Sequence, residues 1–272
     1  MLQDIIDNIF FRLKGGAGQE KKLIRCQCYR QNSIIKWKRQ NKLSWTTNFK
    51  ILRGLEIFDS VKIRKIISEV INNNASLFSQ KDLFVASFGS AGKSGEVIFY
   101  EFRHSELIDG KFFIKSSDIV KLPPKSTIIF VDDLIGTGTQ SLDYIKNKLN
   151  LVLSPSHNAV LFTICATADA VQKIKDSSNF EVLTGITLQE EHRQYYSDKC
   201  HYFNDAEKEV IKELNSRLKN IAEDDYDRGL LIAFYYTVPN STMPIIWKDN
   251  YKYMTEEGTK DWFALLPRRI SF

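Results

Sequence analysis

The sequence has few cysteines and no long apolar run, and each absence excludes a class of protein. Its four cysteines are Cys26, Cys28, Cys165 and Cys200. None of them has further Cys or His ligands at the spacing of a zinc site, so we interpret them as free thiols in a reducing compartment. No apolar stretch approaches the roughly 18 residues that a membrane-spanning helix needs, and no membrane partner is expected.

A secretory signal and low-complexity tracts are missing as well. The segment Met1–Asp7 carries early acids and lacks the basic residues that begin a signal peptide. With 43% hydrophobic and 26% charged residues over 272 positions, the composition is that of a globular protein. We therefore expect a cytoplasmic protein of one or two domains, with no prediction of its oligomeric state beyond the possibility of an oligomer.

Positive charge is concentrated near the N-terminus, although the net charge of the chain is only +5. Glu20 is the one acid within a run of basic residues made up of Arg12, Lys14, Lys21, Lys22, Arg25, Arg30, Lys36, Lys38, Arg39, Lys42, Lys50 and Arg53. Trp37 and Trp45 lie among them, and basic residues interleaved with aromatics suit nucleic-acid or partner binding. The alternative is a solvated helical face whose tryptophans pack inward.

The periodicity of apolar residues changes near Lys81. Before it, helical spacing predominates, which predicts a mainly helical, basic N-terminal region over residues 1–80. After it, short apolar strands alternate with helical segments through residue 272. This alternation predicts an α/β fold, a doubly wound and mainly parallel sheet with right-handed crossovers.

One segment of this second region combines a strand, two acids and a turn. The apolar residues Ile128–Val131 predict a buried strand, Asp132 and Asp133 follow it, and residues 136–139 form a Gly/Thr-rich turn before a helical pattern. In open α/β sheets ligands bind beyond the carboxyl ends of the strands, and a helix N-terminus suits a phosphate. The segment therefore predicts a site for a phosphorylated sugar, with Gly136, Thr137, Gly138 and Thr139 at the phosphate.

A second glycine-rich turn follows the apolar strand predicted at residues 83–88. Its candidate phosphate-binding residues are Gly89, Ser90, Gly92, Lys93 and Ser94. The glycines allow a ligand close to the backbone, and the lysine adds a cation. Two such turns on neighbouring strands could hold a ligand that has a phosphate at each end.

A P-loop NTPase is a rival interpretation of the same two segments. Gly92-Lys93-Ser94 matches the end of the P-loop signature, and the strand that leads to Asp133 is similar to a Walker B strand. The signature also requires a glycine where this chain has Ser87. We therefore keep an NTPase as the third hypothesis.

The segment from Ile128 to Gln140 resembles the phosphoribosyl-diphosphate (PRPP) motif of type I phosphoribosyltransferases. The resemblance implies that fold for residues 81–272, PRPP as ligand, and Mg²⁺ as cofactor. It also implies that Asp132 and Asp133 are catalytic, hold the ribose hydroxyls and meet Mg²⁺ indirectly through the substrate. The turn at residues 89–95 is similar in position to the pyrophosphate-binding loop of that family. Gly136 and Gln140 depart from the usual side chains of the motif.

The C-terminal third carries a further resemblance. Residues 229–247, with Trp262 and Pro267-Arg268-Arg269 after them, look like phosphoribosyltransferase-like proteins of bacterial conflict and anti-phage gene clusters, including those beside retrons. This implies a role in antiviral defence. It also implies a C-terminal hood or lid over the sugar site, in which Asn240, Thr242 and Trp247 could meet a base or partner, the alternative being a rigid surface turn.

Two hypotheses follow for the function. In the first, the chain is a glycosyltransferase that uses PRPP or a related ribose-5-phosphate nucleotide. In the second, it is a catalytically degenerate module of a defence complex that senses a nucleotide, with nucleic acid or a protein partner docked on the basic N-terminal region.

Overall fold

A computed structural model describes residues 11–13, 15–30, 33–89, 93–218, 227–249, 251–255 and 258–268. The chain divides into two compact units, one formed by residues 60–189 and the other by residues 1–59 together with 190–272. The first ten residues of the region expected to be mainly helical lie outside the described residues. In the described part of the chain, no helix has the length and apolar character needed to cross a membrane.

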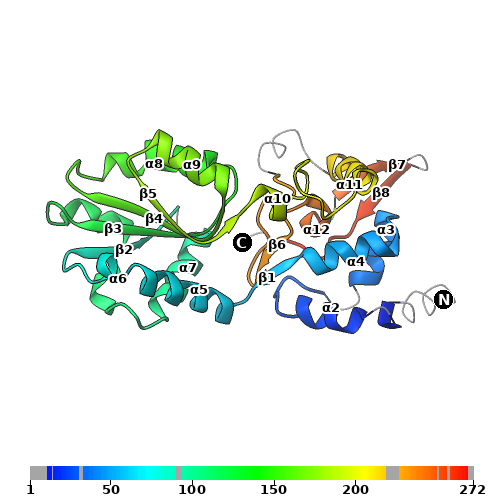
Figure 1. The fold of residues 1–272 in the computed structure, drawn as a ribbon, viewed down its shortest axis with the longest axis horizontal. Helices are drawn as coiled ribbons and strands as arrows, with labels where there is room; N and C mark the ends of the chain where they lie inside the picture. The colour runs from blue at the N-terminus through cyan, green and yellow to red at the C-terminus, as the bar shows by residue number, and fades with distance from the viewer. Residues whose placement is uncertain are drawn as a thin grey trace. The chain divides into compact units, whose positions relative to one another are not determined.

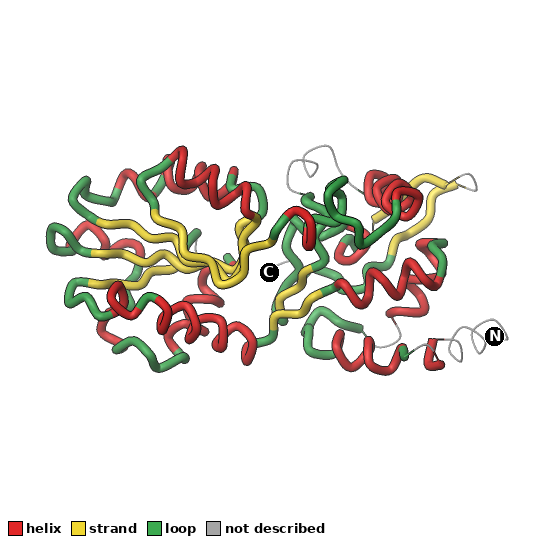
Figure 2. Tube along the Cα trace, viewed as in Figure 1, coloured by secondary structure: helices red, strands yellow, loops and turns green. Residues whose placement is uncertain are grey.

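The unit of residues 60–189 is built around a parallel sheet (Figures 1 and 2). Its strands are β2 (Leu83–Ser87), β3 (Thr127–Ile135), β4 (Asn158–Thr167) and β5 (Glu181–Leu188), and they pair in that order. A single parallel bridge between Val85 and Phe113 adds an edge beside β2. The chain thus moves from β2 outward to residue 113 and then returns past β2 to β3.

Helices cover both faces of this sheet. The helices α5 (Ser60–Asn73) and α7 (Ser94–Arg103) pack together on one face, and α8 (Thr139–Asn147) and α9 (Ala168–Ser177) on the other (Figure 1). Right-handed crossovers place their helices on opposite faces when the chain reverses its direction along the sheet. The expected fold class, α/β with a doubly wound parallel sheet and added N-terminal helices, is confirmed.

Burial on both faces of the sheet explains the apolar sequences of its strands. Ile128, Ile129, Phe130 and Val131 of β3 are completely buried, as are Phe162 of β4 and Phe102 of α7. Strands covered on both faces read as continuous apolar runs rather than alternating ones. This is the reason that β3 could be recognised from the sequence, although it extends through the two acids to Ile135.

The first boundary between the units lies at residues 59 and 60, whereas the sequence had predicted one near residue 80. The difference arises because α5 packs on the sheet. A Cβ atom at Gly185 of β5 would come within 2.1 Å of the Ile66 side chain of α5, so the helix lies directly on that strand. Helical spacing alone does not reveal which partner a helix buries its apolar face against. The short helix α6 (Ala75–Phe78) follows in the same unit.

The other unit joins the two ends of the chain. Its N-terminal part contains α2 (Gly16–Leu23), α3 (Ser33–Asn41), α4 (Trp45–Gly54) and β1 (Glu56–Phe58). Its C-terminal part contains α10 (Glu190–Arg193), α11 (Asp205–Arg217), β6 (Ile232–Phe234), α12 (Pro244–Trp247), β7 (Tyr251–Thr255) and β8 (Gly258–Trp262). The parallel pairing of β1 with β6 links the two parts, so β6 pairs with an N-terminal strand and not with the main sheet.

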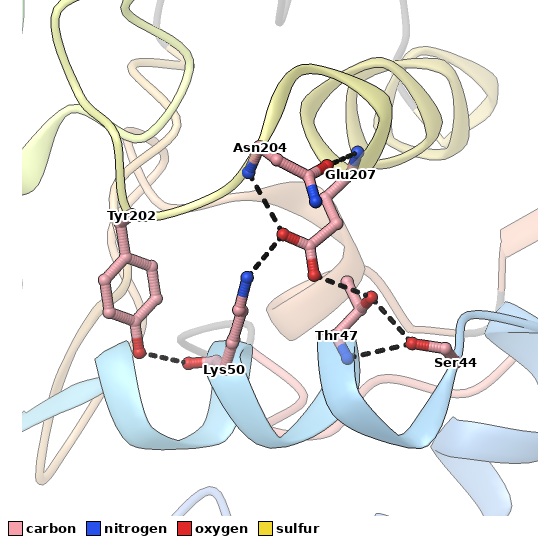
Figure 3. Close-up of polar contacts among 6 residues, drawn as sticks. All are labelled: Ser44, Thr47, Lys50, Tyr202, Asn204 and Glu207. Atoms are coloured by element: carbon pink, nitrogen blue, oxygen red, sulfur yellow. Dashed lines mark hydrogen bonds and ion pairs between the residues drawn. The ribbon is translucent and has the colours of Figure 1, made fainter.

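Polar contacts of Glu207 add a second link within this unit (Figure 3). Its carboxylate accepts hydrogen bonds from Lys50 Nζ at 2.6 Å and from Thr47 Oγ1 at 3.2 Å, both on α4. Asn204 caps α11 in a capping box with the same glutamate. The hydroxyl of Tyr202 donates to the carbonyl of Lys50 at 2.8 Å. The carboxylate of Glu207 therefore takes part in the N-terminal cap of α11 and also binds α4 to that helix.

Candidate ligand site at the switch point of the sheet

The reversal of strand order lies between β2 and β3, and it brings two predicted site segments together. Residues after β2 begin α7, and residues after β3 begin α8. In doubly wound sheets, the crevice outside the carboxyl ends of the strands at such a reversal is the usual ligand site. The predicted residues Ser90 and Gly92 lie outside the described residues.

The N-termini of α7 and α8, which flank the two acids, both lack a side-chain cap, as do those of α2, α6 and α12. Neither Lys93, which precedes α7, nor Gly138, which precedes α8, caps its helix with a side chain. By contrast, Thr167 caps α9 and Asn204 caps α11. The first amides of a helix need partners from outside it. In the described part of the chain we find no protein acceptor for the amides of Thr137, Gly138 and Gln140, so these groups can bind an anion.

The turn that leads into α8 is shaped by its glycine and its neighbours. Gly138 has a φ of 71°, a left-handed conformation in which a side chain is strained. A Cβ atom there would come within 3.3 Å of the Ala170 carbonyl oxygen. The Thr167 hydroxyl donates to the Gly136 carbonyl at 2.6 Å, and the Thr139 amide reaches Thr137 Oγ1 at 3.3 Å. The turn is thus held from the side of α9.

Asp132 and Asp133 lie at the end of β3, as the sequence predicted, but their environments differ. Asp132 is partly exposed, and its Oδ1 accepts hydrogen bonds from Ser94 Oγ at 3.0 Å and from the Asp133 amide at 2.9 Å. Asp133 is buried, and its carboxylate accepts from the Leu134 amide at 2.7 Å. The contact between Ser94 and Asp132 brings the two predicted segments together directly.

The carboxyl of Asp132 is poorly solvated. Burial of this carboxyl, followed by the charge of Asp133, raises the pKa of Asp132 well above its ordinary value, although the Asp133 amide and Ser94 act against the shift. Two adjacent acids whose charges repel each other gain from a bound cation or from hydroxyl donors. The electrostatics of this pair therefore favour a ligand that brings such groups.

Lys93 and Gly89 border the site on the side of β2. Lys93 is exposed and immediately precedes α7, and Gly89 has a φ of 93°. Gly95 lies so close to the strands that a Cβ atom on it would be 2.0 Å from the Phe88 carbonyl oxygen. At the P-loop position Ser87 ends β2, and its hydroxyl donates to Glu96 at 2.7 Å.

Two further residues at the site were not predicted. The hydroxyl of Tyr144 on α8 donates to the Gly89 carbonyl at 2.9 Å, and Lys173 Nζ on α9 donates to Thr139 Oγ1 at 2.9 Å. Both come from the middle of a helix, where a sequence pattern shows only a polar position. No signal in the sequence distinguishes them from solvated residues.

Six of the twelve basic residues near the N-terminus contact other groups within their own unit. Trp37 is completely buried and donates to the Ile245 carbonyl at 2.7 Å, so the inward-packing interpretation is correct for this residue. Lys22 donates to the Leu52 carbonyl at 2.8 Å. Ion pairs or aromatic rings likewise engage Arg25, Arg30, Lys36, Lys38 and Lys50. These contacts leave fewer cations for nucleic acid than the sequence suggests.

The C-terminal residues that could have met a base are used in packing. Thr242 is completely buried and donates to the Ile232 carbonyl at 2.6 Å, and Trp247, 8% exposed, donates to the Thr242 carbonyl at 2.8 Å. The polar atoms of these two side chains are bonded to the backbone, so the structure favours a packing role for them over contact with a base or partner. Asn240 is partly exposed and bonded to Arg268.

The geometry is that of a doubly wound α/β protein with two uncapped helix N-termini and paired carboxylates at its switch point. A protein-family model, PRTase-CE, matches residues 34–268, and the chain belongs to this family. It is thus a phosphoribosyltransferase-like protein. The family gives no support to the P-loop interpretation.

Solved structures with detectable similarity are distant. Orotate phosphoribosyltransferase from Aeropyrum pernix has 16% identity and a TM-score of 0.32, with 46% of this chain and 69% of that chain covered. Orotate phosphoribosyltransferase from Mycobacterium tuberculosis H37Rv in complex with inorganic phosphate has 13% identity and a TM-score of 0.32, with 47% of this chain and 71% of that chain covered. A hypoxanthine-guanine phosphoribosyltransferase from Bacillus anthracis has 13% identity and a TM-score of 0.32, with 50% of this chain and 82% of that chain covered. No curated protein matches the chain.

Proposed function

We propose that this protein binds PRPP or a ribose-5-phosphate nucleotide where β2 and β3 end, and that it acts as a phosphoribosyltransferase. One observation carries the proposal. The helices α7 and α8 begin without a side-chain cap on either side of Asp132 and Asp133. Each uncapped N-terminus suits a phosphate, and carboxylates between them suit the hydroxyls of the sugar that joins two phosphates.

The roles of the residues follow from this placement. The turn Gly136–Thr139 would hold the 5′-phosphate with its amides. The carboxylates of Asp132 and Asp133 would accept hydrogen bonds from the ribose hydroxyls. Gly89, Lys93 and Ser94, with Ser90 and Gly92, would hold the pyrophosphate, where the exposed ammonium of Lys93 can balance its charge.

The donor set at the site fits Mg²⁺ only together with a ligand. Among the described residues, no group of three or more His, Cys, Asp or Glu side chains could hold a metal by itself. Mg²⁺ is commonly held by one or two carboxylates plus substrate phosphates, so Asp132 and Asp133 would meet it through the bound sugar and pyrophosphate. When bound, it would neutralise charge on the pyrophosphate.

The chemistry that this arrangement favours is substitution at the anomeric carbon. A nucleophilic atom of the acceptor forms a bond to that carbon while the carbon–oxygen bond to pyrophosphate breaks, and the electron pair leaves with pyrophosphate. Positive charge develops on the ribose, where Asp132 and Asp133 stabilise it. Rate enhancement then comes mainly from positioning of the two ends of the substrate.

Calorimetric titration of the protein with PRPP, with and without Mg²⁺, tests binding. Asp133→Asn is expected to weaken the interaction, because a neutral amide accepts less strongly from the ribose hydroxyls. Asp143→Asn, an exposed position on α8, serves as the matched control. Absence of PRPP binding by the unaltered protein, or equal binding by both variants, would contradict the proposal.

A second candidate function is ligand binding without turnover. Gly136 and Gln140 replace small side chains that are usual in the PRPP motif, which leaves the backbone of the turn intact but removes possible side-chain contacts with the ligand. Incubation with PRPP, Mg²⁺ and a mixture of nucleobases separates the two functions. Release of pyrophosphate supports the transferase, whereas binding without release supports a sensor whose partner, protein or nucleic acid, docks elsewhere on the chain.

We place either activity in bacterial anti-phage defence, in the cytoplasm. The resemblance of residues 229–247 to phosphoribosyltransferase-like proteins of conflict gene clusters supports this placement. Expression in a bacterial host, followed by plating of a phage panel, tests it. Protection that disappears in Asp133→Asn supports defence through the ligand site, and equal plaque numbers with and without the protein contradict it.

A further inference from the structure

One face of α9 lies along the turn that leads into α8. Thr167, which caps α9, bonds to the Gly136 carbonyl, and Ala170 lies against Gly138. Lys173 Nζ then reaches Thr139 Oγ1 at 2.9 Å. Residues three apart share a face of a helix, so successive turns of α9 contact successive residues of the cradle.

Lys173 is the charged member of this face. In the described part of the chain, its ammonium forms no ion pair with a carboxylate, and the contact it makes is with a hydroxyl. Thr139 is the first residue of α8, whose N-terminus has no side-chain cap and no acid in its first turn. The ammonium is therefore held next to backbone amides that also favour negative charge. Together they form a positively charged position that suits a bound anion.

We propose that Lys173 is a ligand of the phosphate bound at the N-terminus of α8 and sets the requirement for a phosphorylated sugar. This inference rests on the proposed function, since it assigns a residue to the same site. The Lys173 side chain moves from the Thr139 hydroxyl to a phosphate oxygen and adds a charge-assisted bond to those of the turn amides. Unphosphorylated ribose or nucleosides offer it no partner and are excluded.

Ribose 5-phosphate is the appropriate probe, because its single phosphate reports on this cradle alone. In calorimetric titrations, Lys173→Gln is expected to weaken its binding about 10-fold, and Lys173→Arg to retain most of the affinity. Lys175→Gln, a nearby exposed lysine of α9, is the control and is expected to bind as the unaltered protein does. Higher salt should weaken binding less in Lys173→Gln than in the control.

Thr139→Val separates a direct contact from an indirect one. If Lys173 acts only by holding Thr139, removal of the hydroxyl reproduces the loss seen in Lys173→Gln, and the proposal is overturned. A smaller loss in Thr139→Val supports direct contact with the phosphate. Equal affinities of Lys173→Gln and Lys175→Gln would overturn this inference alone, whereas failure of the unaltered protein to bind either ribose 5-phosphate or PRPP would overturn the proposed function as well.

Discussion

The hydroxyl of Tyr144 donates a hydrogen bond to the carbonyl of Gly89 at 2.9 Å, and this bond ties the helix after β3 to the turn after β2. The Tyr144 ring also packs edge-on against Phe88, with ring centroids 4.9 Å apart. Burial raises the pKa of Tyr144, with a contribution from Glu96, so the hydroxyl keeps its proton and remains a donor. The two ends of the proposed ligand site are thereby connected through one side chain.

Tyr144→Phe should weaken PRPP binding about 3- to 10-fold, the effect of one lost hydrogen bond. Binding of ribose 5-phosphate should change little, because the lost bond holds the turn on the pyrophosphate side. Calorimetry with both ligands measures the difference. Tyr100→Phe, at an exposed position of α7, is the control. Equal loss of both ligands would show that Tyr144 supports the whole site and not one side of it.

Asp132→Asn should stabilise the free protein at alkaline pH while weakening ligand binding. The pKa of Asp132 is raised in the folded state, so the group favours folding below its unfolded pKa, and this contribution is lost as the pH rises through the folded pKa. An asparagine does not titrate. The difference in Tm between the variant and the unaltered protein should therefore be largest near pH 8 and shrink as the pH is lowered.

The same thermal series with Asp143→Asn controls for loss of a charge on an exposed surface. That variant should follow the unaltered protein at every pH. A constant difference in Tm between Asp132→Asn and the unaltered protein across the series would show that the carboxyl is not titrating in the range expected from its surroundings.

Gly95→Ala should destabilise the unit of residues 60–189 by about 1–3 kcal/mol, because overpacking displaces the surrounding structure. The added Cβ atom would meet the Phe88 carbonyl oxygen at 2.0 Å and the Val131 carbonyl oxygen at 3.0 Å, both backbone atoms. Gly110→Ala is the matched control, since its Cβ atom would meet nothing within 4 Å. Urea unfolding followed by circular dichroism compares them, and equal midpoints would refute the close approach.

Glu207→Gln should destabilise the unit formed by the two ends of the chain by about 1–3 kcal/mol, since Lys50 loses its charged partner. The pKa of Glu207 is lowered although burial raises it, because the Lys50 ammonium, the Asn204 amide and the Thr47 hydroxyl together outweigh burial. A lowered pKa gives stability above the unfolded pKa that is lost as the pH falls through the folded pKa. The stability of the variant should therefore fall less than that of the unaltered protein as the pH is lowered.

Glu213→Gln provides the comparison on the same helix. Glu213 pairs with Arg217 on the surface of α11, where an exposed pair contributes about 0.5 kcal/mol or less. Thermal unfolding from pH 7 to pH 4 measures both variants. If the two lose the same stability, the network around Glu207 does not connect α4 with α11 energetically.

The sequence by itself indicated the parallel sheet and placed the two acids and the following turn of the proposed ligand site next to each other. A short continuous apolar run such as Ile128–Val131, bounded by turn residues, is typical of a strand covered on both faces, and two acids with a Gly/Thr turn directly after such a strand lie at its carboxyl end. These features depend only on residues that are adjacent in the sequence, so the sequence alone shows them. The adjacency of Asp132 and the cradle turn needed no knowledge of distant contacts.

Tertiary structure alone decided which distant segments meet. The pairing of β1 with β6 involves three residues in each strand, too few for a pattern, and it joins the two ends of the chain into one unit. Tyr144 and Lys173 contact the proposed site from the middle of their helices, whereas Thr242 and Trp247 are buried in the core. The packing of whole helices and strands against one another fixes where each of these side chains points. A hydrogen bond between residues far apart in sequence depends on that packing, which no local spacing encodes.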